Sequence, residues 1–142
     1  MKPGRNANTY KQLGAEFSAQ EASPEQLILM LLEKACENLR SLTLMPLSEA
    51  EEMELQAKID MLTIYHQNSG KVLQILSTLQ DILDFEKGGE LAYQLKDTYG
   101  IILRALWKAV KEKNIGEIEK LLQAINELRV AWETVVANQQ KM

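Results

Sequence analysis

The two residue types with the most versatile side-chain chemistry, histidine and cysteine, each occur once, as His66 and Cys36. A di-metal centre in a helical bundle needs Glu-x-x-His pairs, but the residues around His66 are Thr63 and Tyr65. One histidine and one cysteine also cannot supply the ligands of a zinc site. We therefore predict no metal site and expect His66 to lie on a helix surface or at a kink. Cys36 is expected to be a small buried hydrophobe rather than a nucleophile.

Phosphate-binding chemistry is not indicated either. Gly88 and Gly89 lack the preceding strand and the G-x-x-x-x-G-K spacing of a P-loop. The basic run of Lys108, Lys111 and Lys113 is typical of a solvated helix face. Sixteen Lys plus Arg residues against twenty Asp plus Glu residues give a net charge of −4, so the basic surplus that nucleic-acid binding needs is missing. We predict no catalytic residues, no enzyme activity, no cofactor and no nucleic-acid partner.

The chain length and its first residues indicate one cytoplasmic domain. A chain of 142 residues is long enough for one sizeable core. A single cysteine cannot form an intramolecular disulfide, and the opening residues MKPGRNANTY lack the apolar core of a signal peptide. The apolar run 27–32 falls far short of the roughly 20 residues that cross a bilayer. We expect a cytoplasmic protein with no membrane span.

Apolar residues recur every three or four positions, and no stretch alternates with the period of a strand, which predicts an all-α fold. The boundaries come from Ser23-Pro24, from Pro46, from a Ser48/Glu51 capping box, from the Gly88-Gly89 pair and from the break at 114–116. Four helices are predicted, over 24–45, 49–86, 90–112 and 115–137. Their short connections favour an antiparallel up-down four-helix bundle over 23–138. Residues 1–22 would form a flexible N-terminal arm and residues 139–142 a disordered tail.

The second predicted helix is too long for this bundle. At about 1.5 Å per residue it would span about 57 Å, whereas the other three span on the order of 31 to 35 Å. Either the polar stretch His66–Gly70 kinks it, or its first half projects past the bundle. We favour a kink or break near Gly70.

Helical periodicity separates an expected core from a surplus of apolar residues. The expected core positions of the first, third and last helices are Ile28, Leu31, Leu32, Ala35, Leu39, Leu42, Leu91, Leu95, Tyr99, Ile102, Leu106, Ala109, Ile118, Leu121, Leu122, Ile125, Leu128, Trp132, Val135 and Val136.

The surplus residues lie outside these stripes. Tyr93 and Trp107 are two heptads apart with Gly100 midway, which predicts a shallow saddle into which another helix could settle. One interpretation is that surplus residues pack at the rim under neighbouring elements. The other is a partner-binding patch; ~400 Å² of it would be worth roughly 10 kcal/mol before the cost of ordering the partner. The residues predicted to bind a partner are Leu29, Met30, Leu73, Tyr93, Gly100, Ile101 and Trp107.

Three motifs then resemble a known family. SPEQLILML, LDFEKGGELAYQL and LRVAW occur in that order, and together they resemble the pattern of FliS-type flagellar export chaperones over about residues 23 to 135. The most specific element is Leu83-Asp84 followed by Gly88-Gly89-Glu90-Leu91-Ala92 and Leu95.

This resemblance implies a cytosolic, non-enzymatic bundle that binds the disordered C-terminal segment of flagellin. The client would wrap round the bundle and be kept from polymerising before flagellar type III secretion. The surplus apolar residues would then bind this client, and Tyr10, Leu13 and Phe17 of the N-terminal arm would form a removable lid. An alternative is a regulatory adaptor that binds another flagellar protein, an export-apparatus component or a cochaperone through the same surface.

Overall fold

The computed structural model describes residues 23–83 and 85–140. The predicted lid residues Tyr10, Leu13 and Phe17, and with them the predicted arm, lie outside the described residues. So do the last two residues of the predicted tail.

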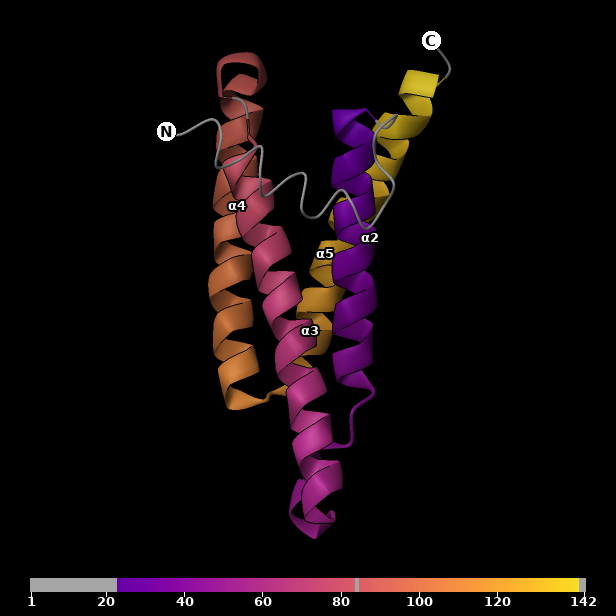
Figure 1. Cartoon of the computed structure of the whole chain (residues 1–142). Coiled ribbons are helices and arrows are strands. Elements are labelled where there is room, and N and C mark those ends of the chain that lie inside the picture. Colours follow the sequence, from indigo (N-terminus) through magenta and orange to yellow (C-terminus); the bar gives the residue numbers. More distant parts are fainter. Residues whose placement is uncertain (1–22, 84, 141–142) are drawn as a thin grey trace.

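The described chain is built from helices. They are α2 (Pro24–Thr43), the 3-10 helix η3 (Leu47–Glu52), α3 (Leu55–Asp81), α4 (Phe85–Glu112) and α5 (Ile115–Gln140). Successive long helices run in opposite directions (Figure 1). Each packs against two neighbours, in the cyclic order α2, α3, α4, α5, and the most extensive contact is between α2 and α5. The predicted all-α, up-down bundle is confirmed.

Helix α2 begins where Ser23-Pro24 predicts. Ser23 Oγ accepts a hydrogen bond from the Gln26 backbone N–H at 3.2 Å, and Gln26 Oε1 accepts one from the Ser23 N–H at 2.7 Å. This reciprocal capping box satisfies two N–H groups that have no partner within the helix. Pro24 occupies the first turn, where its missing N–H has no cost.

The predicted start of the second long helix is wrong. The Ser48/Glu51 pair lies in η3, which has no side-chain cap. The long helix starts after Glu54, whose two carboxylate oxygens accept hydrogen bonds from the Gln56 and Ala57 N–H groups, each at 3.1 Å. A carboxylate that binds two N–H groups at the positive end of the helix is the stronger cap.

The predicted break near Gly70 is also wrong, because α3 continues through it to Asp81. Ser69 is buried on the core side, and Val72 and Ile75 follow it into the core. This packing outweighs the roughly 1 kcal/mol that a helical glycine costs. The other explanation of the length mismatch holds instead: η3 and the first turns of α3 project past the ends of the other helices (Figure 1).

Two further boundaries differ from the prediction, because α3 ends at Asp81 and not at 86, and α4 begins at Phe85 and not at 90. The chain kinks at Gly89, whose φ of 53° suits glycine, and α4 is regular from there on. Asn114 Oδ1 accepts the Glu117 N–H at 3.1 Å and so caps α5. Helix α5 continues to Gln140, so residues 139 and 140, which we expected in the tail, are helical.

Most of the predicted core positions are buried or packed against the core. Tyr65 and Tyr99 are among the largest fully buried side chains, and Cys36 is buried as predicted. Leu91 and Val135 are exceptions, because both are exposed. Val135 is exposed because it lies about 100° round the helix from the buried Val136, and the other helices cover only a narrow stripe of α5 at this end. Leu91 faces a cavity.

Candidate functional site

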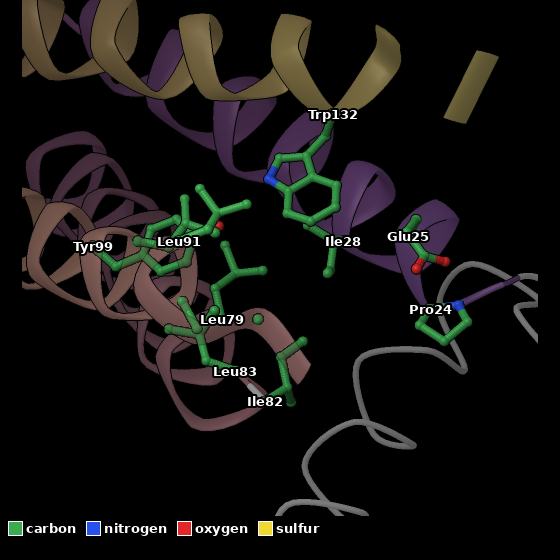
Figure 2. Close-up of a pocket in the computed structure, with 12 residues that line it drawn as sticks. Pro24, Glu25, Ile28, Leu79, Ile82, Leu83, Leu91, Tyr99 and Trp132 are labelled. Atoms are coloured by element: carbon green, nitrogen blue, oxygen red, sulfur yellow. The ribbon is translucent and has the colours of Figure 1, made fainter. Parts of the chain in front are cut away.

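The cavity lies at the end of the bundle where α2 and α4 begin and α3 and α5 end. We call it the open-end pocket; its volume is about 470 Å³ (Figure 2). Its lining residues are Pro24, Glu25, Ile28, Leu79, Ile82, Leu83, Gly88, Leu91, Ala92, Leu95, Tyr99 and Trp132.

Two apolar walls face each other across this pocket. Ile28 from α2 and Trp132 from α5 form one, and Leu79, Leu91 and Tyr99 from α3 and α4 form the other (Figure 2). The pairs α2/α5 and α3/α4 touch here through the hydrogen bond between Tyr99 and Trp132, but beside it they leave space that side chains do not fill. This is why Leu91, at a core position by periodicity, is 61% exposed.

Few polar side chains line the pocket. Burial raises the pKa of Tyr99 above its usual value of 10, although a hydrogen bond with Trp132 acts in the opposite direction, so the phenol stays neutral at physiological pH. At the rim, a hydrogen bond from the Gln139 side chain lowers the pKa of Glu25, and a backbone hydrogen bond adds to the effect. Glu25 is therefore ionised near neutral pH and links the start of α2 to the end of α5.

A second hollow lies between α3 and α4 on the side of the bundle. This α3–α4 hollow, of about 380 Å³, is lined by Leu73, Ser77, Leu103, Arg104 and Trp107. The Trp107 side chain is 62% exposed although it is among the largest apolar groups in the chain. A guanidinium beside an exposed indole offers a partner one apolar and one charged contact.

The predicted partner-binding residues do not form one patch. Leu73 and Trp107 meet in the α3–α4 hollow, and Tyr93 and Ile101 are exposed on α4. Leu29 and Met30 are half-buried on α2, which lies diagonally across the bundle from α4.

Gly100 does not form the open saddle that its position between Tyr93 and Trp107 predicts. It is buried, and a Cβ there would lie 3.2 Å from Gln80 Nε2. The Gln80 side chain reaches over from α3 and donates to the Lys96 carbonyl at 3.1 Å. Gly100 therefore serves the close approach of α3 and α4 within the chain.

The described residues contain no group of three or more His, Cys, Asp or Glu side chains that could hold a metal ion. His66 is exposed and contacts the Tyr65 ring edge-to-face at 5.5 Å between centroids. Burial raises the pKa of the Cys36 thiol above 9, which disfavours the reactive thiolate. Among the helices of the described chain, none is long and apolar enough to span a bilayer.

The sequence pattern missed the open-end pocket. Ile28, Leu95 and Trp132 pack on the core as periodicity predicts, but periodicity does not show that they also line a pocket or that Leu91 is exposed in it. The signal that could have revealed the pocket was the position of three of its residues. Ile82, Leu83 and Leu91 lie on either side of the kink at Gly89, where α3 ends and α4 begins.

A four-helix bundle with two apolar hollows, and with no metal-binding cluster among its described residues, belongs to the class of helical binding proteins. The family described as flagellar protein FliS matches residues 6–140, and the chain belongs to this family.

Three relatives are named flagellar secretion chaperones. FliS of Salmonella typhimurium is 30% identical over 136 residues, which cover 95% of this chain and 93% of the relative. FliS of Vibrio cholerae is 23% identical over 130 residues, with 89% and 85% covered. FliSB of Pseudomonas aeruginosa is 24% identical over 126 residues, with 89% and 91% covered. The chain is thus a chaperone of flagellar export and not an enzyme.

Proposed function

We propose that this chaperone binds the C-terminal segment of flagellin in the cytoplasm and keeps it from polymerising before secretion. The observation that carries the proposal is the pair of apolar hollows at different places on one bundle. A client that wraps round the bundle needs several separate anchoring sites, and two hollows suit successive amphipathic helices of one segment.

The open-end pocket suits the apolar face of a client helix. Its walls hold Ile28 and Trp132 on one side and Leu91 on the other, so an inserted side chain would contact both helix pairs. Glu25 at the rim adds one negative charge that can pair with a basic client residue.

The α3–α4 hollow suits a second anchor. Trp107 offers a large exposed ring, and rings of this kind supply much of the binding energy at interfaces. Arg104 can pair with a client carboxylate and so fix the direction of the client segment. Tyr93 and Ile101, exposed on the same helix, extend this surface along α4.

The N-terminal arm is proposed as a lid over the open-end pocket when the client is absent. The arm joins the bundle at Ser23, immediately before Pro24 and Glu25, which line the pocket. Tyr10, Leu13 and Phe17 have the spacing of one helical face, and their apolar side chains would occupy the space that the client takes. Deleting residues 1–17 should then raise client affinity, whereas an unchanged affinity would refute the lid.

Isothermal titration calorimetry with a synthetic C-terminal flagellin peptide tests the proposal. Leu91→Lys probes the open-end pocket and Trp107→Lys the α3–α4 hollow. Val130→Lys is the matched control, because Val130 is exposed on α5 and lines neither hollow. We expect both site variants to bind at least tenfold more weakly, an effect of about 1.4 kcal/mol, and the control to bind normally. No binding at tens of micromolar peptide would favour the adaptor function instead, to be followed by pull-downs with other flagellar export proteins.

A further inference from the structure

A polar contact crosses the surface between α3 and α4. These two helices pack against each other (Figure 1), and Gln80 Nε2 on α3 donates a hydrogen bond to the Lys96 carbonyl on α4 at 3.1 Å. In a regular helix this carbonyl also accepts the N–H of Gly100, four residues further on. A carbonyl oxygen has two lone pairs and can accept both donors. The Gln80 amide therefore binds on top of a turn of α4 without breaking it.

The space for this amide exists because residue 100 has no side chain. A Cβ at that position would lie 3.2 Å from Gln80 Nε2 and 3.4 Å from Arg104 Nη1. These two groups are what the described residues place over Gly100, which is buried. Both are the far ends of flexible side chains, so they can move aside while the backbone stays in place. We call the recess formed by Gly100 and the Lys96 carbonyl the amide notch.

The amide notch lies midway between two exposed aromatic residues of α4. Tyr93 and Trp107 are each seven residues from Gly100, and each is more than half exposed. They are about 21 Å apart along the helix axis. Arg104, which lines the α3–α4 hollow, is about one helical turn from Gly100. The Gln80 side chain thus crosses the surface that a client bound along α4 would follow from one ring to the other.

We propose that the amide notch recognises an asparagine or glutamine side chain of the client, and that Gln80 occupies it in the free chain as an internal substitute. This inference rests on the proposed function. Gln80 itself supports it, because its side chain shows that a primary amide fits over Gly100 and donates to the Lys96 carbonyl at a normal distance. When the client binds, its amide takes this place and the Gln80 side chain turns toward the solvent.

The exchange needs little energy, because one amide replaces another. The hydrogen bond of Gln80 is exposed, so water satisfies both of its partners when it opens. Gln80 then competes with the client for the notch and lowers the client's affinity. A client with an apolar side chain at this point would displace Gln80 without replacing its hydrogen bond. The notch therefore contributes selectivity between clients more than affinity for any one of them.

Isothermal titration calorimetry with the synthetic C-terminal flagellin peptide tests the notch through its glycine. Gly100→Ala places a methyl group where the client amide would lie, and should weaken binding about fivefold. Gly70→Ala is the matched control, because Gly70 also lies within a long helix but is exposed, with nothing within 4 Å of a Cβ. It should leave binding unchanged. Alanine favours a helix over glycine at both positions, so thermal circular dichroism should show that neither change lowers the melting temperature.

A double-mutant cycle tests the role of Gln80. Gln80→Ala removes the competing amide and should strengthen peptide binding about threefold. In the Gly100→Ala chain the same change should give no gain, because the methyl group blocks the notch whether or not Gln80 is present. The double variant also lacks the 3.2 Å contact with Gln80 Nε2, so strain from that contact cannot explain its weak binding.

The client side is tested by replacing each asparagine and glutamine of the peptide in turn with leucine. One replacement should weaken binding to the unmodified chain about fivefold and have no further effect on binding to the Gly100→Ala chain. Equal binding by the Gly100→Ala and Gly70→Ala chains, a gain from Gln80→Ala that persists in the double variant, or a peptide without such an amide would overturn the notch and leave the proposed function standing. A peptide that binds neither the unmodified chain nor any variant would overturn both.

Discussion

Trp107→Lys is the substitution that best separates client binding from stability. A tryptophan side chain buries up to about 250 Å², and Trp107 is 62% exposed in the free chain. A client would therefore cover roughly 150 Å² more, worth about 4 kcal/mol gross at about 25 cal/mol per Å². Ordering of the client offsets about half of this. We expect the variant to bind the flagellin peptide ten- to thirtyfold more weakly, or about 1.4 to 2 kcal/mol.

The same substitution should have little effect on folding. A lysine stem keeps part of the contact with Leu73 and Leu103 while its ammonium stays in water. A loss below about 1 kcal/mol shifts the melting temperature by no more than about 4 °C for a chain of this size. Calorimetry and thermal circular dichroism on Trp107→Lys and on the Val130→Lys control measure both quantities. Equal loss of binding in the control, or a much larger fall in melting temperature, would refute the assignment of Trp107 to the client-binding surface.

Three further predictions concern the bundle itself. Tyr65→Phe removes the hydrogen bond to the Val110 carbonyl and should lower the free energy of unfolding by about 1 kcal/mol in urea titrations; no change would show that this bond contributes nothing. Burial raises the pKa of the Cys36 thiol, so it should react with a thiol reagent at mildly alkaline pH only after unfolding, and rapid labelling of the native chain would contradict this. The folded pKa of Glu25 is lowered, chiefly by Gln139. Its small stabilising effect is therefore present above the unfolded pKa, near 4.5, and is lost as the pH falls through the lower folded value. Melting curves of Glu25→Gln should show a weaker dependence on pH in that window, and an unchanged dependence would exclude this role.

The helix boundaries that were predictable from the sequence are those set by one dominant local signal. Ser23-Pro24 starts α2 and Gly89 sets the kink before the regular part of α4. The stretch between α2 and α3 was not predictable in this way, because Ser48 and Glu51 have the spacing of a capping box, whereas glutamate, the residue type at position 54, is not one that N-caps favour. In the structure Glu54 caps the long helix, residues 47–52 form a 3-10 helix, and Met53 between them is extended.

The exposed part of the candidate site was predictable to a similar degree. Tyr93, Ile101 and Trp107 fall outside the core stripe of their helix, and all three are exposed. The open-end pocket was not predictable, because periodicity tells which face of a helix is apolar but not whether the facing helix lies close enough to fill the space. Leu91 and Leu106 occupy the same stripe, yet only Leu106 is fully buried.

The apolar run 27–32 on α2 shows how one helix can serve both folding and binding. Helix α2 packs against both α3 and α5, so it needs a wider apolar face than the three positions in seven of an ordinary core-facing helix. Leu27, Leu31 and Leu32 are buried in these contacts, while Ile28 packs on the core and also lines the open-end pocket. Substitutions on α2 should therefore change folding and the proposed client contact together. On α4, Tyr93 and Trp107 are exposed outside the core stripe, so variants of these two residues are the ones that can distinguish a lost client-binding contact from a damaged fold.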